Sequence, residues 1–308
     1  MSQPSLRKIW GALWLVYIVW GSTYLAIEFA IRSMPPLLSM GARFFAASFL
    51  LGIFLWIKIG KSFLQINLSQ LLALALLGGL LLGLGLGMVT LAQYNDVPSG
   101  IVALLISALP FWIAIFKAIE GTKTSALSWL GIGIGFMGVG ILLQPELSKP
   151  NNNLHIFWMF MVIIGNLGWA FGTYITPRLD LPKNIFVITF YQMLLGGVGM
   201  SVAGILTDEQ LHDFFDASIS SWGWWLYLVL IGSIATYSAY VWLVANAPVG
   251  LISTYAYVNP VVAVIAGSLI LAEPISTQIV LGGGLVIAGV AMMVTARSRT
   301  IKAGGTAH

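Results

Sequence analysis

Long apolar segments follow one another along the whole chain, and only short polar connections separate them. A transmembrane helix needs about 20 mostly apolar residues. The pattern predicts a helix for each of ten such segments, and no connection is long or polar enough to form a separate soluble domain. The predicted spans lie near residues 9–31, 35–57, 69–93, 98–118, 126–144, 154–176, 184–206, 222–245, 249–271 and 277–296.

Composition supports a membrane protein. Of the 308 residues, 59% are hydrophobic and only 8% are charged, whereas soluble domains carry about 25% charged residues. Cysteine is absent, which excludes disulfides, thiolate metal sites and a cysteine nucleophile. We therefore expect the lipid bilayer as a partner, and no nucleic acid, metal or cofactor.

The basic residues predict the orientation, because Lys and Arg accumulate in cytoplasmic loops. With the N-terminus inside, only Arg32 and Lys149 fall on the outer side. We expect both termini to be cytoplasmic, which also accounts for the net charge of +4. The basic residues on the inner side are Arg7, Lys8, Lys58, Lys61, Lys117, Lys123, Arg178, Lys183, Arg297, Arg299 and Lys302.

The chain repeats itself at an offset of about 150 residues. Residues 97–110 read VPSGIVALLISALP, and residues 247–260 read APVGLISTYAYVNP. The pairs are Pro98 with Pro248, Gly100 with Gly250, Pro110 with Pro260, Thr23-Tyr24 with Thr173-Tyr174, Trp20 with Trp169, and Gly131, Gly133 and Gly138 with Gly282, Gly284 and Gly289.

The repeat has a consequence for topology. Each half holds five predicted helices, and because five is odd the second half enters the membrane from the opposite side. Inverted repeats of this kind build many secondary transporters, in which a site near the midplane opens alternately to either side. The sequence therefore predicts an all-α polytopic membrane protein with repeats at 9–144 and 154–296 and a cytoplasmic tail at 297–308.

Several short motifs occur in a fixed order along the chain. They are Trp20-Gly21-Ser22-Thr23-Tyr24, Arg43-Phe44-x-Ala46-Ala47, Pro98-x-Gly100, Pro110, Pro248-x-Gly250, Tyr257-x-Asn259-Pro260 and Glu273-Pro274. Their order and spacing resemble the EamA family of the drug/metabolite transporter superfamily, and most of all its YedA-like permeases. The resemblance covers about residues 9–296, and it implies a ten-helix bacterial inner-membrane protein that moves small metabolites, often outward. In one loop the two copies depart from a strict repeat, because Glu273-Pro274 has no counterpart in register.

Two charged residues lie within predicted spans. A buried charge in a membrane should face protein or water and have a partner. Arg43 is either a counter-charge for an anionic or zwitterionic substrate, or it is paired structurally with helix-end carbonyls or Glu28. Glu28 could couple transport to an ion, but an i, i+4 pair with Arg32 is favoured.

Two prolines, Pro110 and Pro260, fall in the middle of predicted helices, and each removes a backbone donor. Such breaks are tolerated in membranes where cavity water or other groups satisfy the backbone. We expect kinked helices that line a cavity. The alternative is a kink that serves only the packing of the helices. Of the two faces of the ninth helix, we prefer the one with Tyr257 over the one with Tyr255.

Amides and aromatic side chains within the spans are candidates for a substrate cavity. They could recognise a substrate, or they could bond one helix to another, where each bond contributes about 0.6 kcal/mol. The set is Trp20, Tyr24, Gln93, Asn166, Trp169, Tyr191, Gln192, Tyr237, Tyr257 and Asn259, together with Arg43.

A glycine pattern, Gly133-x-Gly135-x-x-Gly138, fits the dinucleotide-binding fingerprint, but it lies inside an apolar helix with no preceding strand. Glycines here let membrane helices approach closely.

The functional hypothesis is a secondary transporter that exports small amphipathic metabolites such as amino acids. The alternatives are an importer of the same solutes, or a scaffold or receptor without transport. An intramembrane enzyme would need clustered His, Asp or Glu, so we do not expect an enzyme. Substrate identity, coupling ion and oligomeric state are left open.

Overall fold

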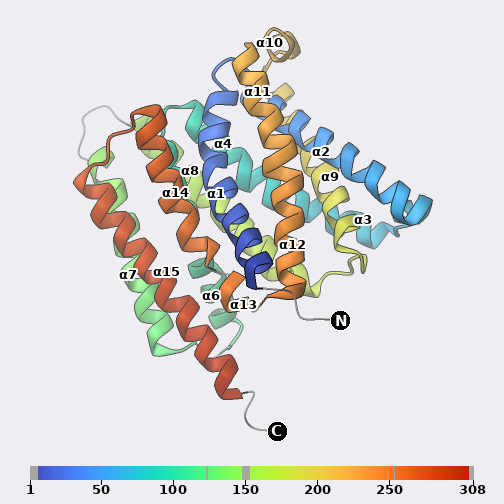
Figure 1. Cartoon of the computed structure of the whole chain (residues 1–308). Helices are drawn as coiled ribbons and strands as arrows, with labels where there is room; N and C mark the ends of the chain where they lie inside the picture. The colour runs from blue at the N-terminus through green and yellow to red at the C-terminus, as the bar shows by residue number, and fades with distance from the viewer. Residues whose placement is uncertain (1–5, 123, 148–152, 248, 253, 305–308) are drawn as a thin grey trace. The chain divides into compact units, whose positions relative to one another are not determined.

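The computed structural model describes residues 6–122, 124–147, 153–247, 249–252 and 254–304, and all secondary structure within them is helical. Figure 1 shows these helices in chain order. Among the described residues, nine helices are long and apolar enough to cross a membrane, and the apolar helix Tyr255–Leu271 is shorter. The predicted fold class is confirmed. Lys123, Lys149 and Pro248, used above for topology and the repeat, lie outside the described residues.

The helices of the first half follow the predicted spans. Two 3-10 or π segments, η1 and η2, continue α-helices without a break in the chain. The bounds are α1 Leu6–Ala30, α2 Pro36–Ile59, η1 Gly60–Leu64, α3 Leu68–Gly78, η2 Gly79–Leu86, α4 Gly87–Tyr94, α5 Ser99–Ile106, α6 Leu109–Ile119 and α7 Ala126–Leu147.

The helices of the second half do the same, with one extra short helix, α10, in the longest polar connection. The last helix continues into the predicted tail. The bounds are α8 Asn153–Ile175, η3 Thr176–Arg178, α9 Ile185–Leu206, α10 Leu211–Phe215, α11 Ile219–Tyr227, η4 Leu228–Ala235, α12 Thr236–Asn246, α13 Val249–Ile252, α14 Tyr255–Leu271 and α15 Thr277–Gly304.

The described residues belong to two compact units, and neither unit corresponds to one repeat. Unit 1 contains Met1–Leu25, Val97–Phe160 and Ser238–His308, and unit 2 contains Ala26–Asp96 and Met161–Tyr237. Each unit therefore takes helices from both halves of the sequence.

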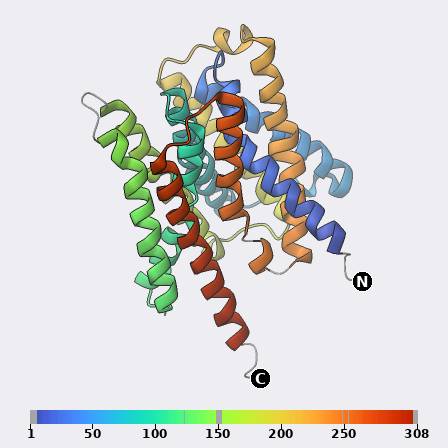
Figure 2. The ribbon, with the colours of Figure 1, turned by 60° about the vertical axis from the view of Figure 1, so that its left-hand side comes forward.

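In unit 1, α7 and α15 lie side by side, as both views show (Figures 1 and 2). A Cβ added at Gly138 would lie 2.5 Å from the carbonyl oxygen of Gly282, and one added at Gly289 would overlap the carbonyl oxygen of Gly131. The earlier glycine of α7 thus meets the later glycine of α15, so the two helices are antiparallel. Only glycine permits this close backbone approach.

In unit 2, α2 packs along α9 in the same antiparallel sense. A Cβ at Gly41, near the start of α2, would lie 3.0 Å from the carbonyl oxygen of Gly197, late in α9. A Cβ at Gly52, near the end of α2, would lie 2.9 Å from the ring of Phe190, early in α9.

Each of these two pairs joins counterpart helices of the repeat. The helices α2 and α9 are the second spans of their halves, and α7 and α15 are the fifth spans. Counterpart helices that cross the membrane in opposite senses are what an inverted repeat requires. In unit 1, α5 and α14, from the fourth span of each half, also pack together.

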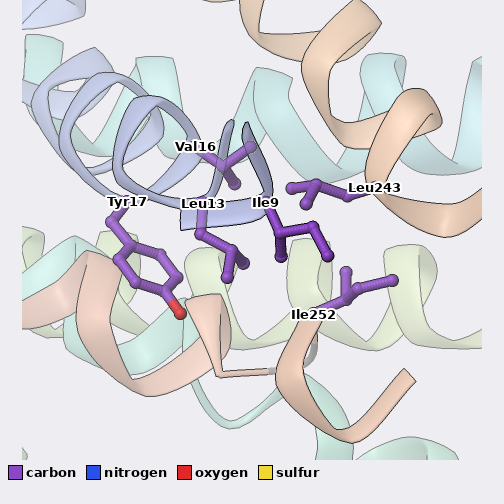
Figure 3. Close-up of a cluster of buried hydrophobic side chains, with 6 residues drawn as sticks. All are labelled: Ile9, Leu13, Val16, Tyr17, Leu243 and Ile252. Carbon is purple, nitrogen blue, oxygen red and sulfur yellow. The ribbon is translucent and has the colours of Figure 1, made fainter. Parts of the chain in front are cut away.

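An apolar core fixes the beginning of α1 within unit 1. Figure 3 shows Ile9, Leu13, Val16 and Tyr17 of α1 facing Leu243 of α12 and Ile252 of α13. The partly buried aromatic residues Trp20, Tyr240 and Tyr255 pack against this cluster.

Candidate functional site

Arg43 of α2 is buried inside unit 2, with a relative exposure of 6%. Its Nε donates a hydrogen bond to the hydroxyl of Ser233 at 3.1 Å. The other contacts of the guanidinium are weak: Nη1 lies 3.8 Å from the sulfur of Met40, and the ring centroid of Phe44 is 5.1 Å from Cζ. The described neighbours of this charge are therefore neutral.

The structural pairing considered for Arg43 is not formed. Within the described part of the chain, no carboxylate forms an ion pair with Arg43, and its hydrogen bonds go to side chains and not to helix-end carbonyls. Glu28 is half-buried in α1. The guanidinium of Arg32 instead lies over the ring of Phe29, 4.2 Å from its centroid. A buried cation without an anion in a membrane is costly, typically by about 3 kcal/mol on insertion scales.

Ser233 lies in a stretch of π-helix, and a second such stretch occupies the matching place in the other repeat. Both segments, η2 and η4, are eight residues long, and they begin at Gly79 and Leu228, 149 residues apart. Each ends with a backbone bond to the carbonyl five residues back, from Gly87 to Leu82 and from Thr236 to Ile231.

The π segments are the part of the site that sequence reasoning missed. π-Helical turns are rare and are frequent at functional sites. The small residues Gly83, Gly85, Gly232 and Ser233 in these segments were the available signal, but glycine in a membrane helix more often indicates close packing. In η2, Gly85 serves that purpose too, because a Cβ there would lie 2.8 Å from the indole of Trp169 in α8.

Unit 1 holds an aromatic cluster in place of a charge. The ring of Trp20 lies 5.2 Å from that of Tyr240 and 5.4 Å from that of Tyr255, and the two tyrosine rings are 5.9 Å apart. Three helices, α1, α12 and α14, each contribute one ring. Tyr24, one turn after Trp20, is half-buried in the same unit.

Tyr255 and Asn259, on the face of α14 opposite to that of Tyr257, contact α1. Tyr255 joins the aromatic cluster. The amide of Asn259, in the orientation that satisfies its neighbours, donates to the carbonyl oxygens of Tyr17 at 3.2 Å and Tyr255 at 3.3 Å. Tyr257 is half-buried and does not belong to the ring cluster of Trp20. Helical spacing separated the two faces correctly, but it carried no information about which face α1 covers.

The remaining predicted residues of unit 2 lie in several places. Tyr191 is part of an apolar cluster with Leu55, Phe63, Leu74 and Val187. The hydroxyls of Tyr237 and Thr189 are 2.5 Å apart and join α12 to α9. Gln93 in α4 and Asn166 in α8 are buried, and Gln192 in α9 is half-buried.

The two prolines behave differently. Pro110 follows an interruption at Ser107–Ala108, where α5 ends and α6 begins. Pro260, however, lies inside the continuous helix α14. The expectation of a break at Pro260 therefore does not match the helix. A proline removes only one hydrogen bond, which kinks a helix that its neighbours can still support.

Acidic and histidine residues form no metal-binding group in the described part of the chain. No group of three or more His, Asp or Glu there could hold a metal ion. The fully buried polar side chains of the described spans are one arginine, hydroxyls and amides, and Glu28 of α1 is half-buried.

Antiparallel counterpart helices in both units, together with the apolar spans, define a multi-pass membrane protein with a duplicated transporter fold. The chain belongs to the EamA-like transporter family, whose model matches residues 9–144 and again residues 156–295. It is thus a membrane transporter.

Its relatives agree with this family. The chain is 37% identical over 293 residues to YedA of Escherichia coli K12, described as an uncharacterized inner membrane transporter, with 95% of this chain and 92% of that protein covered. It is 21% identical over 290 residues to a protein of the same strain described as a probable amino-acid metabolite efflux pump, covering 89% and 91%. A crystal structure that is 16% identical shares the fold, with a TM-score of 0.61 over 94% of this chain and 98% of that one.

Proposed function

We propose that this membrane transporter is a secondary transporter of the bacterial inner membrane that exports small amphipathic metabolites, amino acids among them, by alternating access. The observation that carries the proposal is the antiparallel packing of counterpart helices, because an inverted repeat can present equivalent pathways to the two sides of a membrane. The 21% identical relative, described as a probable amino-acid metabolite efflux pump, supports the solute class and the direction.

The two repeats do not move as separate halves in this proposal. The glycine contacts of α7 with α15 and of α2 with α9 tie each repeat to the other. Separating the repeats would open these close backbone contacts, so the rigid parts are expected to contain paired helices from both repeats. Both termini face the cytoplasm, as the distribution of Lys and Arg predicts.

Arg43 is the proposed anchor for the substrate's carboxylate. Its charge has no described anionic partner, and a guanidinium binds a carboxylate with two parallel hydrogen bonds. Ser233 accepts from Nε and Met40 makes only a long contact with Nη1, so the terminal nitrogens keep donors for a ligand. An amino acid would meet this requirement, whereas its carboxamide would not.

The test is reconstitution into liposomes with a panel of amino acids and their carboxamides, each measured in both directions. We expect net export of at least one amino acid over its amide, by about 10–100-fold in kcat/KM, which corresponds to one charge-assisted bond. Arg43→Met should abolish this preference, and Arg32→Met serves as the matched control because Arg32 is exposed.

Each outcome decides a different part of the proposal. Net uptake of the same solutes would identify an importer, and no flux of any compound would favour a scaffold or receptor. Equal losses of acid and amide transport in Arg43→Met would show that Arg43 has only a structural role.

A further inference from the structure

Two glutamates each cap the beginning of a helix that is far away in the sequence. The carboxylate of Glu209 accepts hydrogen bonds from the backbone N–H groups of Leu37 at 3.0 Å and Leu38 at 2.8 Å, in the first turn of α2. The carboxylate of Glu273 accepts from Ser99 at 2.8 Å and Gly100 at 3.1 Å, in the first turn of α5. One contact lies in unit 2 and the other in unit 1.

Both helices need a cap from elsewhere. Their N-cap residues are prolines, Pro35 and Pro98, and neither makes a side-chain cap hydrogen bond. The first N–H groups of a helix have no partner within it, and the positive end of the helix favours an anion. A carboxylate that accepts two of these N–H groups satisfies both requirements.

The chain positions both glutamates in the same way. Each follows a residue other than glycine with positive φ, Asp208 at 62° after α9 and Ala272 at 56° after α14. The N–H of Glu209 then bonds to the carbonyl of Gly204 at 2.9 Å, and that of Glu273 bonds to the carbonyl of Gly267 at 3.2 Å.

The same two glycines make room for the carboxylates. A Cβ at Gly204 would lie 2.9 Å from Oε2 of Glu209, and a Cβ at Gly267 would overlap Oε2 of Glu273. Glycine, a left-handed turn and glutamate thus recur as one arrangement in two places.

Each contact fixes one end of a pair of counterpart helices. Glu209 ties the end of α9 to the start of α2, and Glu273 ties the end of α14 to the start of α5. The opposite end of the α2–α9 pair is different. One hydroxyl, that of Ser48, donates to the carbonyl of Phe190 at 3.1 Å, and beyond it Leu55 packs in an apolar cluster with Val187 and Tyr191. Apolar contacts have no preferred direction, so they permit tilting that two directed hydrogen bonds resist.

We propose that Glu209 and Glu273 are a matched pair of positioning residues that hold one end of α2 to α9 and of α5 to α14, and that the opposite end of the α2–α9 pair moves during transport. This inference rests on the proposed alternating-access function. We call the contact of each glutamate with its helix a clamp. With both termini cytoplasmic, as predicted, both clamps lie at the outer ends of their helices.

Hydrogen exchange tests the clamps without any substrate. In Glu273→Ala, the amides of Ser99 and Gly100 should exchange at least about 10-fold faster, the ratio expected for losing a charge-assisted bond. Glu209→Ala should do the same to Leu37 and Leu38. Asp216→Ala is the matched control, because Asp216 is an exposed acid in the same connection as Glu209. Unchanged exchange in both glutamate variants would overturn the clamps.

A second variant distinguishes loss of the clamp's hydrogen bonds from loss of the glutamate's negative charge. Gly267→Ala keeps Glu273 but places a methyl group against its carboxylate, and it should speed exchange at Ser99 and Gly100 as Glu273→Ala does. In the double variant with Gly267→Ala and Glu273→Ala, these amides should exchange no faster than in either single variant, because both changes remove the same interaction. Gly199→Ala, at a position with nothing within 4 Å, is the control. Additive effects would contradict the proposal.

Spin labels test the movement, and the absence of native cysteine allows them to be placed freely. Labels at Lys58 and Lys183 report the apolar end of the α2–α9 pair, and labels at Arg32 and Thr207 report the clamped end. With a transported amino acid, the first distance should change and the second should not, unless Glu209 is replaced by Ala. A larger distance change at the clamped end than at the apolar end, with Glu209 intact, would contradict the proposal that Glu209 holds that end fixed. Absence of any transported solute would instead count against the proposed function, while the exchange result would still decide the clamps.

Discussion

The two compact units share their packing but differ in their polar chemistry. Each unit contains an antiparallel pair of counterpart helices in glycine contact and one glutamate clamp. Unit 2 contains the buried charge of Arg43 and both π segments, whereas unit 1 contains a neutral cluster of aromatic rings and hydroxyls. Duplication therefore kept the backbone contacts and left the side chains between them to diverge.

The largest effect is expected where backbone meets backbone in unit 1. Gly289→Ala places a methyl group against the carbonyl of Gly131, and overpacking of this kind destabilises by about 1–3 kcal/mol. In unit 2, Gly41→Ala should have less effect, because its nearest neighbour is the rotatable hydroxyl of Ser201. Unfolding in detergent measures both, with Gly133→Ala, in open space, as the control.

A buried charge should make unit 2 sensitive to the loss of a single hydroxyl. Ser233→Ala removes the acceptor of the Arg43 Nε, and an unsatisfied buried donor of this kind costs about 1–2 kcal/mol. Ser233→Thr keeps the hydroxyl and should restore most of the stability. Equal stabilities of the Ala and Thr variants would show that the bond contributes nothing.

The corresponding change in unit 1 should have a smaller effect, because both partners are neutral. Tyr17→Phe removes the bond between the Tyr17 and Thr254 hydroxyls, and such bonds in membrane proteins contribute about 0.6 kcal/mol. Tyr94→Phe, at an exposed tyrosine, is the control in the same unfolding assay. A loss larger than that of Ser233→Ala would reverse the comparison between the units.

The smallest effect concerns pH at the clamp of unit 2. Burial raises the pKa of Glu209, although the hydrogen bonds from Leu38 and Leu37 oppose the shift. The folded state then binds this proton more tightly than the unfolded chain does. The proton on Glu209 therefore contributes to the stability of the folded state. This contribution is full below the ordinary glutamate pKa of about 4.3, and it is lost as pH rises through the raised pKa of the folded state. Glu209→Gln should flatten this slope in thermal unfolding above about pH 4. An unchanged slope would contradict the assignment.

The sequence was sufficient for the spans, the repeat and the glycine contacts, because hydrophobic length and a constant offset are properties of the chain itself. It was insufficient wherever a partner is distant. The carboxylate that caps α2 belongs to Glu209, which is 171 residues from Leu38 in the sequence. No local sequence pattern predicts this contact. The contact of Tyr255 with Trp20 of α1 could not be predicted for the same reason, since a helical wheel does not show which face a neighbour covers.

The glycine contacts between α7 and α15 have the form found in a two-fold homodimer. Shifting by 151 residues turns Gly131 into Gly282 and Gly138 into Gly289, so the contact of Gly131 with Gly289 becomes that of Gly282 with Gly138, which also exists. Such a surface is complementary to itself. The two-fold relation holds for these backbone contacts but not for every side chain, because the position that corresponds to Arg43 at an offset of 150 residues is Met193. One chain with two copies of the unit can therefore carry a single buried charge, which a true homodimer would have to carry twice.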